Sequence, residues 1–164
     1  MALALNKHTA RFWRKPVRTD SLGNPDLDQL TVAVSRMTVE GSVDRYRFGK
    51  SARKSGLEVQ ALLGELRAVE DAVQQQLTEW IAKGGEVRLD VPDAGLAAAR
   101  VWVCDLSDGT ARLPCGGTHL SSLVELGAVR AELLPAEDGS PELVVTTTPG
   151  PGGRAGEGPG AKSH

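Results

Sequence analysis

The clearest pattern of apolar and polar positions runs from residue 55 to residue 85. Apolar side chains recur there at steps of three and four, while polar side chains take the remaining positions; the apolar set is Leu62, Leu63, Leu66, Val69, Val73, Leu77 and Ile81. This spacing places them on one face of a helix. Ser55 and Glu58 fit a capping box at its start, and Gly84-Gly85 fits its end. The pattern predicts one helix of about seven turns.

Shorter segments alternate between apolar and polar residues, which is typical of strands. They cover residues 30–39, 43–48, 86–91, 100–104, 127–134 and 142–147. Residues 137–140, with the sequence EDGS, are expected to form a hairpin turn, residues 93–99 a short helix or turn, and the basic run 50–54 a loop. A long helix buries its apolar face best against such strands. We therefore predict an α+β fold with the long helix packed on an antiparallel sheet.

The two ends of the chain differ from its middle. In residues 1–30, the apolar Leu3, Leu5, Phe12 and Trp13 fit a short helix that Pro16 stops, and a polar turn region follows at 20–28. Residues 149–164 are dominated by Gly and Pro and offer little to bury, so we expect a disordered tail. This divides the chain into an N-terminal segment 1–30, a central domain 31–148 and the tail 149–164.

Composition narrows the class of protein. Hydrophobic residues make up 40% of the 164 residues but aromatic residues only 4%, so the core must consist mainly of Leu, Val and Ala. A formal charge of −2 and a pI near 5.9 give no global attraction to nucleic acid, and we expect no DNA partner. No stretch reaches the ~20 apolar residues of a membrane span, and the start lacks the order of a secretory signal. We expect a cytoplasmic protein without a membrane partner.

The candidate chemistry lies between the strands at 100–104 and 127–134. Cys115 and His119 are four residues apart with Gly116-Gly117 between them, and paired glycines favour a loop over a helix. Such a loop allows the thiol and the imidazole to converge, and both are good zinc ligands. The glycines also expose backbone amides to a bound group. On spacing alone, a structural coincidence is an equally good reading, because a catalytic zinc normally has three protein ligands.

The segment from Pro114 to His119, with the sequence PCGGTH, resembles the signature of the AlaX-type editing proteins. These proteins are related to the editing domains of alanyl- and threonyl-tRNA synthetases. The resemblance covers about residues 39–134 and includes the order of elements: a long helix, a strand, the signature and a further strand. It implies the α+β fold of the second additional (editing) domain, in which a helix packs on an antiparallel sheet.

The resemblance also implies an activity and a cofactor. The family hydrolyses the ester of a mischarged tRNA, typically serine or glycine on tRNA for alanine, with a zinc ion held by a HxxxH pair and by the Cys and His of the signature. Here His8 and Thr9 match the first half of the HxxxH motif, but Phe12 stands where the second histidine is expected. Either His8, Cys115 and His119 hold the zinc, or the likeness at His8 is chance and two ligands remain.

Several other residues have two readings each. Asp105 and Asp108 either orient a ligand histidine or form a turn, and Arg112 either approaches phosphate or is solvated. Cys104, Trp80 and Trp102 are expected in the core.

Three functions follow from these observations. The first is a zinc-dependent hydrolase that deacylates mischarged tRNA in trans, with Thr9 and Thr118 near the aminoacyl group and backbone amides at Gly116 and Gly117 supporting catalysis. The second is a silent module of the same fold that binds tRNA ends, an amino acid or a protein. The third is a metal-dependent hydrolase of another small ester or amide. The sequence does not reveal the oligomeric state.

Overall fold

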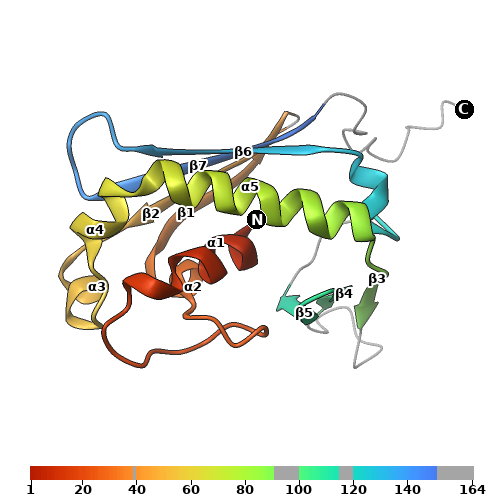
Figure 1. Ribbon diagram of the computed structural model, residues 1–164, viewed down its shortest axis with the longest axis horizontal. Helices are drawn as coiled ribbons and strands as arrows, with labels where there is room; N and C mark the ends of the chain where they lie inside the picture. The colour runs from red at the N-terminus through yellow and green to blue at the C-terminus, as the bar shows by residue number, and fades with distance from the viewer. Residues whose placement is uncertain (39, 91–99, 115–119, 151–164) are drawn as a thin grey trace, which may run out of the picture.

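The computed structural model describes residues 1–38, 40–90, 100–114 and 120–150, and it shows the α+β fold that the sequence predicts (Figure 1). One long helix lies along a four-stranded antiparallel sheet, and a three-stranded antiparallel sheet lies near the C-terminal end of that helix. The helices are α1 (Ala2–Thr9), α2 (Leu27–Thr31), α3 (Lys50–Lys54), α4 (Val59–Gly64) and α5 (Leu66–Lys83), with 3₁₀ turns η1 (Ala10–Phe12) and η2 (Leu123–Leu126).

The strands belong to two separate sheets. The larger sheet has the order β1-β2-β7-β6 and the smaller sheet the order β3-β4-β5. All neighbouring strands are antiparallel. Their bounds are β1 (Val32–Thr38), β2 (Gly41–Arg47), β3 (Val87–Asp90), β4 (Val101–Leu106), β5 (Gly109–Pro114), β6 (Val129–Pro135) and β7 (Glu142–Pro149). No helix in the described part of the chain has the length and apolar character that a membrane crossing requires.

The core forms between α1, α5 and the inner face of the larger sheet. Its largest fully buried side chains come from all three layers and include Leu5, Leu27, Tyr46, Phe48, Leu62, Val69, Val73, Leu143 and Val145. The short N-terminal helix was predicted from Leu3, Leu5 and Phe12, and this prediction is confirmed, because all three are buried and the helical region ends before Pro16. Residues 1–30 therefore contribute to the same core as the strands.

The prediction of one continuous helix from residue 55 is wrong. The backbone leaves the helical region at Glu65 (φ −109°, ψ 16°), directly after Gly64, and this divides the segment into α4 and α5. Gly64 is a poor helix former, so it weakens the pattern where the break occurs. The capping box at Ser55 does not form, since Gly56 has a φ of +99° and α4 begins only at Val59. The basic run 50–54, expected as a loop, forms α3.

The apolar face within this region is confirmed. Leu66, Val69, Val73, Leu77 and Ile81 are buried along α5 at the predicted spacing.

The smaller sheet contains a strand that the sequence pattern did not reveal. Residues 109–114, expected as part of a loop, pair with β4 as β5, in register Cys104–Ala111 and Trp102–Leu113. Ser107 and Asp108 make the connecting turn, and Gly109, the first residue of β5, has a φ of +137° that other residues rarely adopt. This strand carries the chain directly to Pro114, the residue before Cys115.

Helix α5 also closes one edge of the larger sheet. The Ala131 N–H donates to Gln74 Oε1 (2.9 Å), the Leu133 N–H donates to Glu70 Oε2 (2.8 Å), and Gln74 Nε2 donates to the Val129 carbonyl (2.8 Å). These three bonds occupy main-chain groups of β6, the last strand of its sheet, that would otherwise face outward. Gln74 and Glu70 therefore make the hydrogen bonds to β6 that a further strand would otherwise make.

Replacement of Gln74 by Ala tests this edge closure. We expect Gln74→Ala to lower the free energy of unfolding by about 1–2 kcal/mol, because it leaves a β6 donor and a β6 acceptor without partners. Gln75→Ala is the matched control, since Gln75 bonds only Glu79 on the helix surface, and it should change stability by less than about 0.5 kcal/mol. Urea unfolding measures both, and equal effects of the two variants would contradict the assignment.

Candidate functional site

The predicted site residues Cys115, Gly116, Gly117, Thr118 and His119 lie outside the described residues. The structure does describe the chain on both sides of them. Pro114 pairs with Val101 at the end of β5. On the other side, the Ser121 carbonyl accepts from the Val87 N–H at 2.9 Å, and Ser122 forms a bridge with Glu86. The segment is therefore anchored at β5 on one edge of the smaller sheet and at the start of β3 on the other.

A largely apolar cavity of about 280 Å³ lies between these anchors, α1 and α5. Its walls include Leu3 from α1, Leu77 and Trp80 from α5, Trp102 from β4, and also Leu113 and Leu123. Leu113 precedes the PCGGTH segment by one residue and Leu123 follows it by four. A pocket with apolar walls and few polar groups is the usual form of a small-molecule site. Two residues that line this cavity, Leu113 and Leu123, therefore flank the PCGGTH segment in the sequence.

A second, smaller cavity of about 140 Å³ has a mixed lining, and we call it the polar cavity because several charged side chains line it. It shares Ala2, Leu3 and Leu113 with the apolar cavity and reaches Pro114. Its charged walls come from Asp20, Asp26 and Asp28 and from Arg18 and Arg112. The two cavities are therefore neighbours, and Pro114, the first residue of the PCGGTH segment, lines the smaller one.

Asn6 fixes the carboxylates of the polar cavity. Its side-chain amide donates to Asp20 Oδ2 (3.0 Å) and Asp26 Oδ1 (3.3 Å), and its Oδ1 accepts from the Asp28 N–H (3.1 Å). Asn6 is only 1% exposed, so this network ties the buried face of α1 to residues 20–28. Because these carboxylate oxygens already have donors within the fold, the network is explained by structure alone.

Asp28 is the carboxyl of this group whose pKa is raised. Burial raises the pKa of Asp28 above its ordinary value, and the Tyr46 hydroxyl, which donates to Asp28 Oδ1 at 3.0 Å, partly opposes this. Burial, followed by the charge of Asp28, also raises the pKa of Tyr46, so Tyr46 stays protonated and keeps donating.

His8 lies at the other end of α1 from these cavities. Burial is the main cause that lowers its pKa, and the charge of Lys7 adds to it. Its Nε2 atom is buried and has no hydrogen-bond partner among the described residues. His8 is therefore a neutral imidazole with one unused nitrogen, the form that binds a metal. The structure brings it near Gln76 and Asp108, while Pro114 lies beside the start of α1.

Lys7 provides a contact that the sequence did not indicate. Its Nζ donates to Gln76 Oε1 (2.6 Å) on α5 and to Asp108 Oδ2 (2.5 Å) in the β4–β5 turn. One lysine thus joins α1, α5 and the smaller sheet. Nothing in the spacing of polar residues distinguishes Lys7 from a solvated lysine, so this contact could not be predicted from the sequence.

Thr9 and Phe12 face the core of the fold. Thr9 is completely buried, and its hydroxyl donates to the Leu5 carbonyl at 2.8 Å. Phe12, at the expected position of a second histidine, is 3% exposed and packs in the core. The hydrogen bond within α1 accounts for Thr9, and its predicted contact with an aminoacyl group stays a prediction.

The remaining candidates form ion pairs or lie in the core. Arg88 donates to Asp105 (2.8 Å), and this hydrogen bond lowers the pKa of Asp105. Arg112 donates to Asp90 (2.7 Å). Cys104 is a fully buried thiol, as predicted, and burial raises its pKa. Trp80 is buried as predicted, and Trp102 is half-buried against the core.

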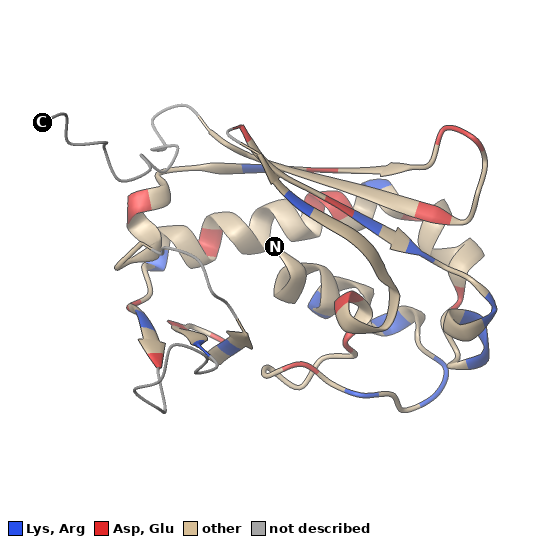
Figure 2. Cartoon of the chain, turned by 180° about the vertical axis from the view of Figure 1, so that it is seen from behind, with Lys and Arg blue, Asp and Glu red and all other residues tan. Residues whose placement is uncertain are grey.

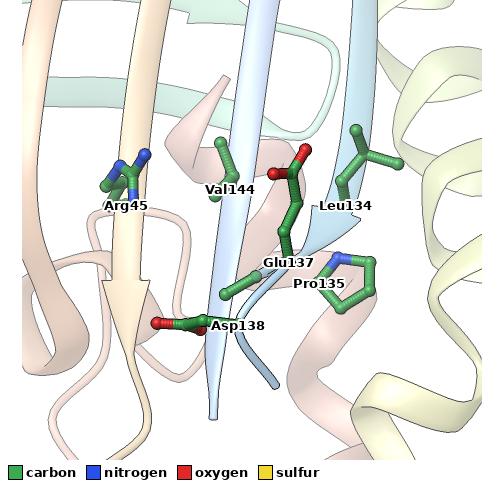
Figure 3. A pocket seen from close by; sticks show the side chains of 7 residues that line it. Arg45, Leu134, Pro135, Glu137, Asp138 and Val144 are labelled. Atoms are coloured by element: carbon green, nitrogen blue, oxygen red, sulfur yellow. The ribbon is translucent and has the colours of Figure 1, made fainter. Parts of the chain in front are cut away.

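Other hollows contain none of the predicted residues. The one in Figure 3, of about 380 Å³, lies at the turn between β6 and β7, where Arg45 and Asp138 line its rim. In the described ranges, no three His, Cys, Asp or Glu side chains gather closely enough to hold a metal ion. Comparison with models of known protein families and with curated proteins found no match to this chain.

The raised pKa of Asp28 predicts a pH-dependent stability. A carboxyl with a raised pKa in the fold contributes stability that is complete below its unfolded pKa, about pH 4, and is lost as the pH rises through its folded pKa. Asp28→Asn keeps an acceptor for Tyr46 without the charge. We expect it to match the parent protein near pH 3.5 and to be more stable at pH 7, by no more than about 1 kcal/mol because Asp28 retains some solvent contact.

Urea unfolding at the two pH values measures this difference. Tyr46→Phe serves as the comparison, since it leaves Asp28 without its donor and should cost about 1–3 kcal/mol at pH 7. A parent protein that is more stable than Asp28→Asn at pH 7, but not at pH 3.5, would reverse the sign and refute the account.

Proposed function

We propose that this protein is a hydrolase of the AlaX type, which removes serine or glycine from mischarged tRNA for alanine in trans. The observation that carries the proposal is the sequence PCGGTH at residues 114–119, together with the place of Pro114, the described residue that begins it. The strand that leads into it, β5, ends where the apolar and polar cavities meet. A helix on an antiparallel sheet, as the family resemblance implies, supports the same assignment.

The chemistry of the substrate suits the two cavities. The 3′ end of an aminoacyl-tRNA joins an uncharged aromatic base, through its ribose, to an amino acid that carries an ammonium group. The apolar cavity offers space for an uncharged ring. The smaller cavity beside Pro114 is lined by three carboxylates (Asp20, Asp26 and Asp28) and two guanidinium groups (Arg18 and Arg112), so it offers carboxylates to an ammonium group and guanidinium groups to an anion. Editing is needed because a binding pocket discriminates poorly between amino acids of similar size, and a second hydrolytic site supplies the missing selectivity.

His8 offers one ligand atom for a zinc ion, because its imidazole is neutral and its buried Nε2 has no partner among the described residues. It lies at the opposite end of α1 from Pro114, the residue before Cys115. The positive Lys7 beside it disfavours a cation, although its contact with Asp108 offsets that charge. Phe12 offers no ligand atom. We propose Cys115 and His119 as the other ligands; a zinc ion held there would polarise the ester carbonyl and its attacking water.

Groups of the protein itself would position the aminoacyl ester for hydrolysis. Backbone amides at Gly116 and Gly117 are suited to stabilise negative charge that develops on the ester oxygen, and Thr118 offers a hydroxyl near the aminoacyl group. This assignment requires no side-chain nucleophile.

A second function is favoured by one observation, the burial of Phe12 at the position of the second histidine. A site with too few ligands would lose its metal and its turnover but could retain the cavities. The chain would then be a binding module for tRNA ends, an amino acid or a protein.

Metal analysis and a deacylation assay separate these functions. We expect one zinc per chain in the purified protein, lost in Cys115→Ala and retained in Cys104→Ala. Cys104 is the matched control because its thiol is buried in the core strand β4. With zinc bound, the protein should release serine from mischarged tRNA for alanine, and Cys115→Ala should reduce that rate by at least about a hundredfold.

The alternatives give different results. A protein without zinc that still binds the tRNA end would support the binding module. A zinc-loaded protein that leaves every aminoacyl-tRNA intact, yet cleaves small esters, would point to a different metal-dependent hydrolase. Zinc retained in Cys115→Ala would remove the proposed metal centre.

A further inference from the structure

Four cations gather at one end of the molecule, from two segments that are far apart in the sequence. They are Lys15, which follows η1, and Lys50, Arg53 and Lys54 of α3, and we call them the basic cluster. The Arg14 N–H donates to the Gly56 carbonyl (2.9 Å), and Lys15 Nζ donates to the Lys54 carbonyl (3.3 Å), so the two segments are bonded to each other. In Figure 2, blue Lys and Arg positions gather at the end of the molecule that holds α3.

The three cations of α3 share one face of that helix. Lys50, Arg53 and Lys54 stand at positions i, i+3 and i+4, while Ala52 is buried in the core. All four side chains of the basic cluster are exposed. Like charges at these spacings repel one another, and protein surfaces usually mix both signs of charge. Packing within the chain therefore does not account for this arrangement.

No acid that the structure describes neutralises the basic cluster, since none of its four side chains forms an ion pair there. The acids that follow α3 in the sequence are already paired: Glu58 with Arg14 (2.6 Å) and Glu65 with Arg11 (2.6 Å). Of the 21 acidic residues in the sequence, only Asp93 and Glu157 lie outside the described ranges. The chain carries a formal charge of −2, so the basic cluster is a local reversal of that sign.

The surroundings of the basic cluster suit a phosphate backbone better than a membrane. Binding to a membrane surface combines cations with apolar side chains that enter the lipid. The exposed large hydrophobic side chains of the described chain lie elsewhere, at Leu30, Val34, Met37, Leu89, Val124 and Leu134. The phosphates of a nucleic acid require only exposed cations that are spaced along a surface.

The basic cluster lies at the opposite end of α5 from the apolar cavity. Helix α3 leads through α4 into the start of α5, whereas the cavity contacts α5 at Leu77, Trp80 and Ile81, near its end (Figure 1). From Leu66 to Leu77 the helix runs about 17 Å. A small molecule that fills the cavity therefore does not reach the cluster, but a nucleic acid whose end enters the cavity does.

We propose that the basic cluster binds the phosphate backbone of the tRNA whose 3′ end enters the apolar cavity. The choice of tRNA as the polyanion rests on the proposed deacylase function. Contacts to phosphates add affinity without reading the sequence of bases. The cluster therefore contributes to the affinity for tRNA, and not to the choice between amino acids.

Removal of two cations tests this contact. The double variant Arg53→Gln/Lys54→Gln should weaken the binding of uncharged tRNA for alanine by at least about tenfold at ~50 mM salt. The slope of log affinity against log salt concentration should become shallower by about 1.5. Fluorescence anisotropy over a series of salt concentrations measures both quantities.

The double variant should keep its fold. Both side chains are exposed, and the bond from Lys15 goes to the main chain of Lys54, so no hydrogen bond of the described fold is removed. Circular dichroism and thermal unfolding check this.

Arg36→Gln/Arg130→Gln is the matched control, because it changes the net charge by the same amount. Arg36 and Arg130 are exposed and pair with Val43 and Thr148, at the end of the larger sheet opposite to the one where β2 leads into α3. This variant should change the affinity for tRNA by less than about threefold.

Hydrolysis distinguishes this proposal from the proposed activity. The two substrates are serine esterified to full-length tRNA and serine esterified to the 3′-terminal dinucleotide, which is too short to reach from the cavity to the cluster. In Arg53→Gln/Lys54→Gln, kcat/KM for the full-length substrate should fall by about tenfold, through a higher KM, and kcat/KM for the short substrate should stay unchanged. A parent protein that cleaves neither substrate contradicts the deacylase, whereas the binding measurement still tests the cluster.

Three results would overturn the proposal. The first is an unchanged tRNA affinity and salt slope in Arg53→Gln/Lys54→Gln. The second is an equal loss of affinity in the control variant, which would show an effect of net charge alone. The third is tighter binding of the parent protein to vesicles of phosphatidylcholine and phosphatidylserine than to tRNA, with that binding lost in Arg53→Gln/Lys54→Gln, which would assign the cluster to a membrane surface.

Discussion

Burial of the short helix α1 is the constraint on which the rest of the structure depends. Leu3 and Leu5 pack with α5 and the sheet residues in one core, and the same helix lines both cavities. If α1 left its place, the smaller sheet would lose its contact through Lys7 and the cavities would lose a wall. Because eight residues alone form a marginal helix in water, α1 owes its structure to this packing.

Polar contacts fix how α1 sits among its neighbours. Apolar burial is non-directional, so on its own it would allow α1 to rotate or slide. Asn6 and Lys7 prevent this, since one bonds the residues 20–28 on one side and the other bonds α5 and the β4–β5 turn on the opposite side. Asn6 is buried, and removing a partner from a buried polar group costs more free energy than the bond itself contributes, so its bonds favour one arrangement of α1.

The sequence predicts the fold correctly in the segments where apolar residues recur at a regular spacing. The apolar face of α5 and six of the strands follow from the spacing of apolar residues. The break at Glu65 was missed because the apolar period continues through Gly64. Strand β5 was missed because its alternation is short and rests on only two apolar residues, Ala111 and Leu113. The sequence predicts only part of the candidate site. PCGGTH was evident, but the cavities, the Asn6 network and the Lys7 contacts join residues far apart in the chain, and no local pattern encodes them.

The closed edge at β6 has a consequence for how copies of this chain can assemble. A sheet with two open edges can add strands from neighbours without limit, and such growth leads to fibres. Here Gln74 and Glu70 leave the larger sheet with at most one usable edge, so a contact made through it uses up the only point of growth. Gln74 and Glu70 thereby prevent a further strand from adding at β6, so any assembly through the larger sheet is finite.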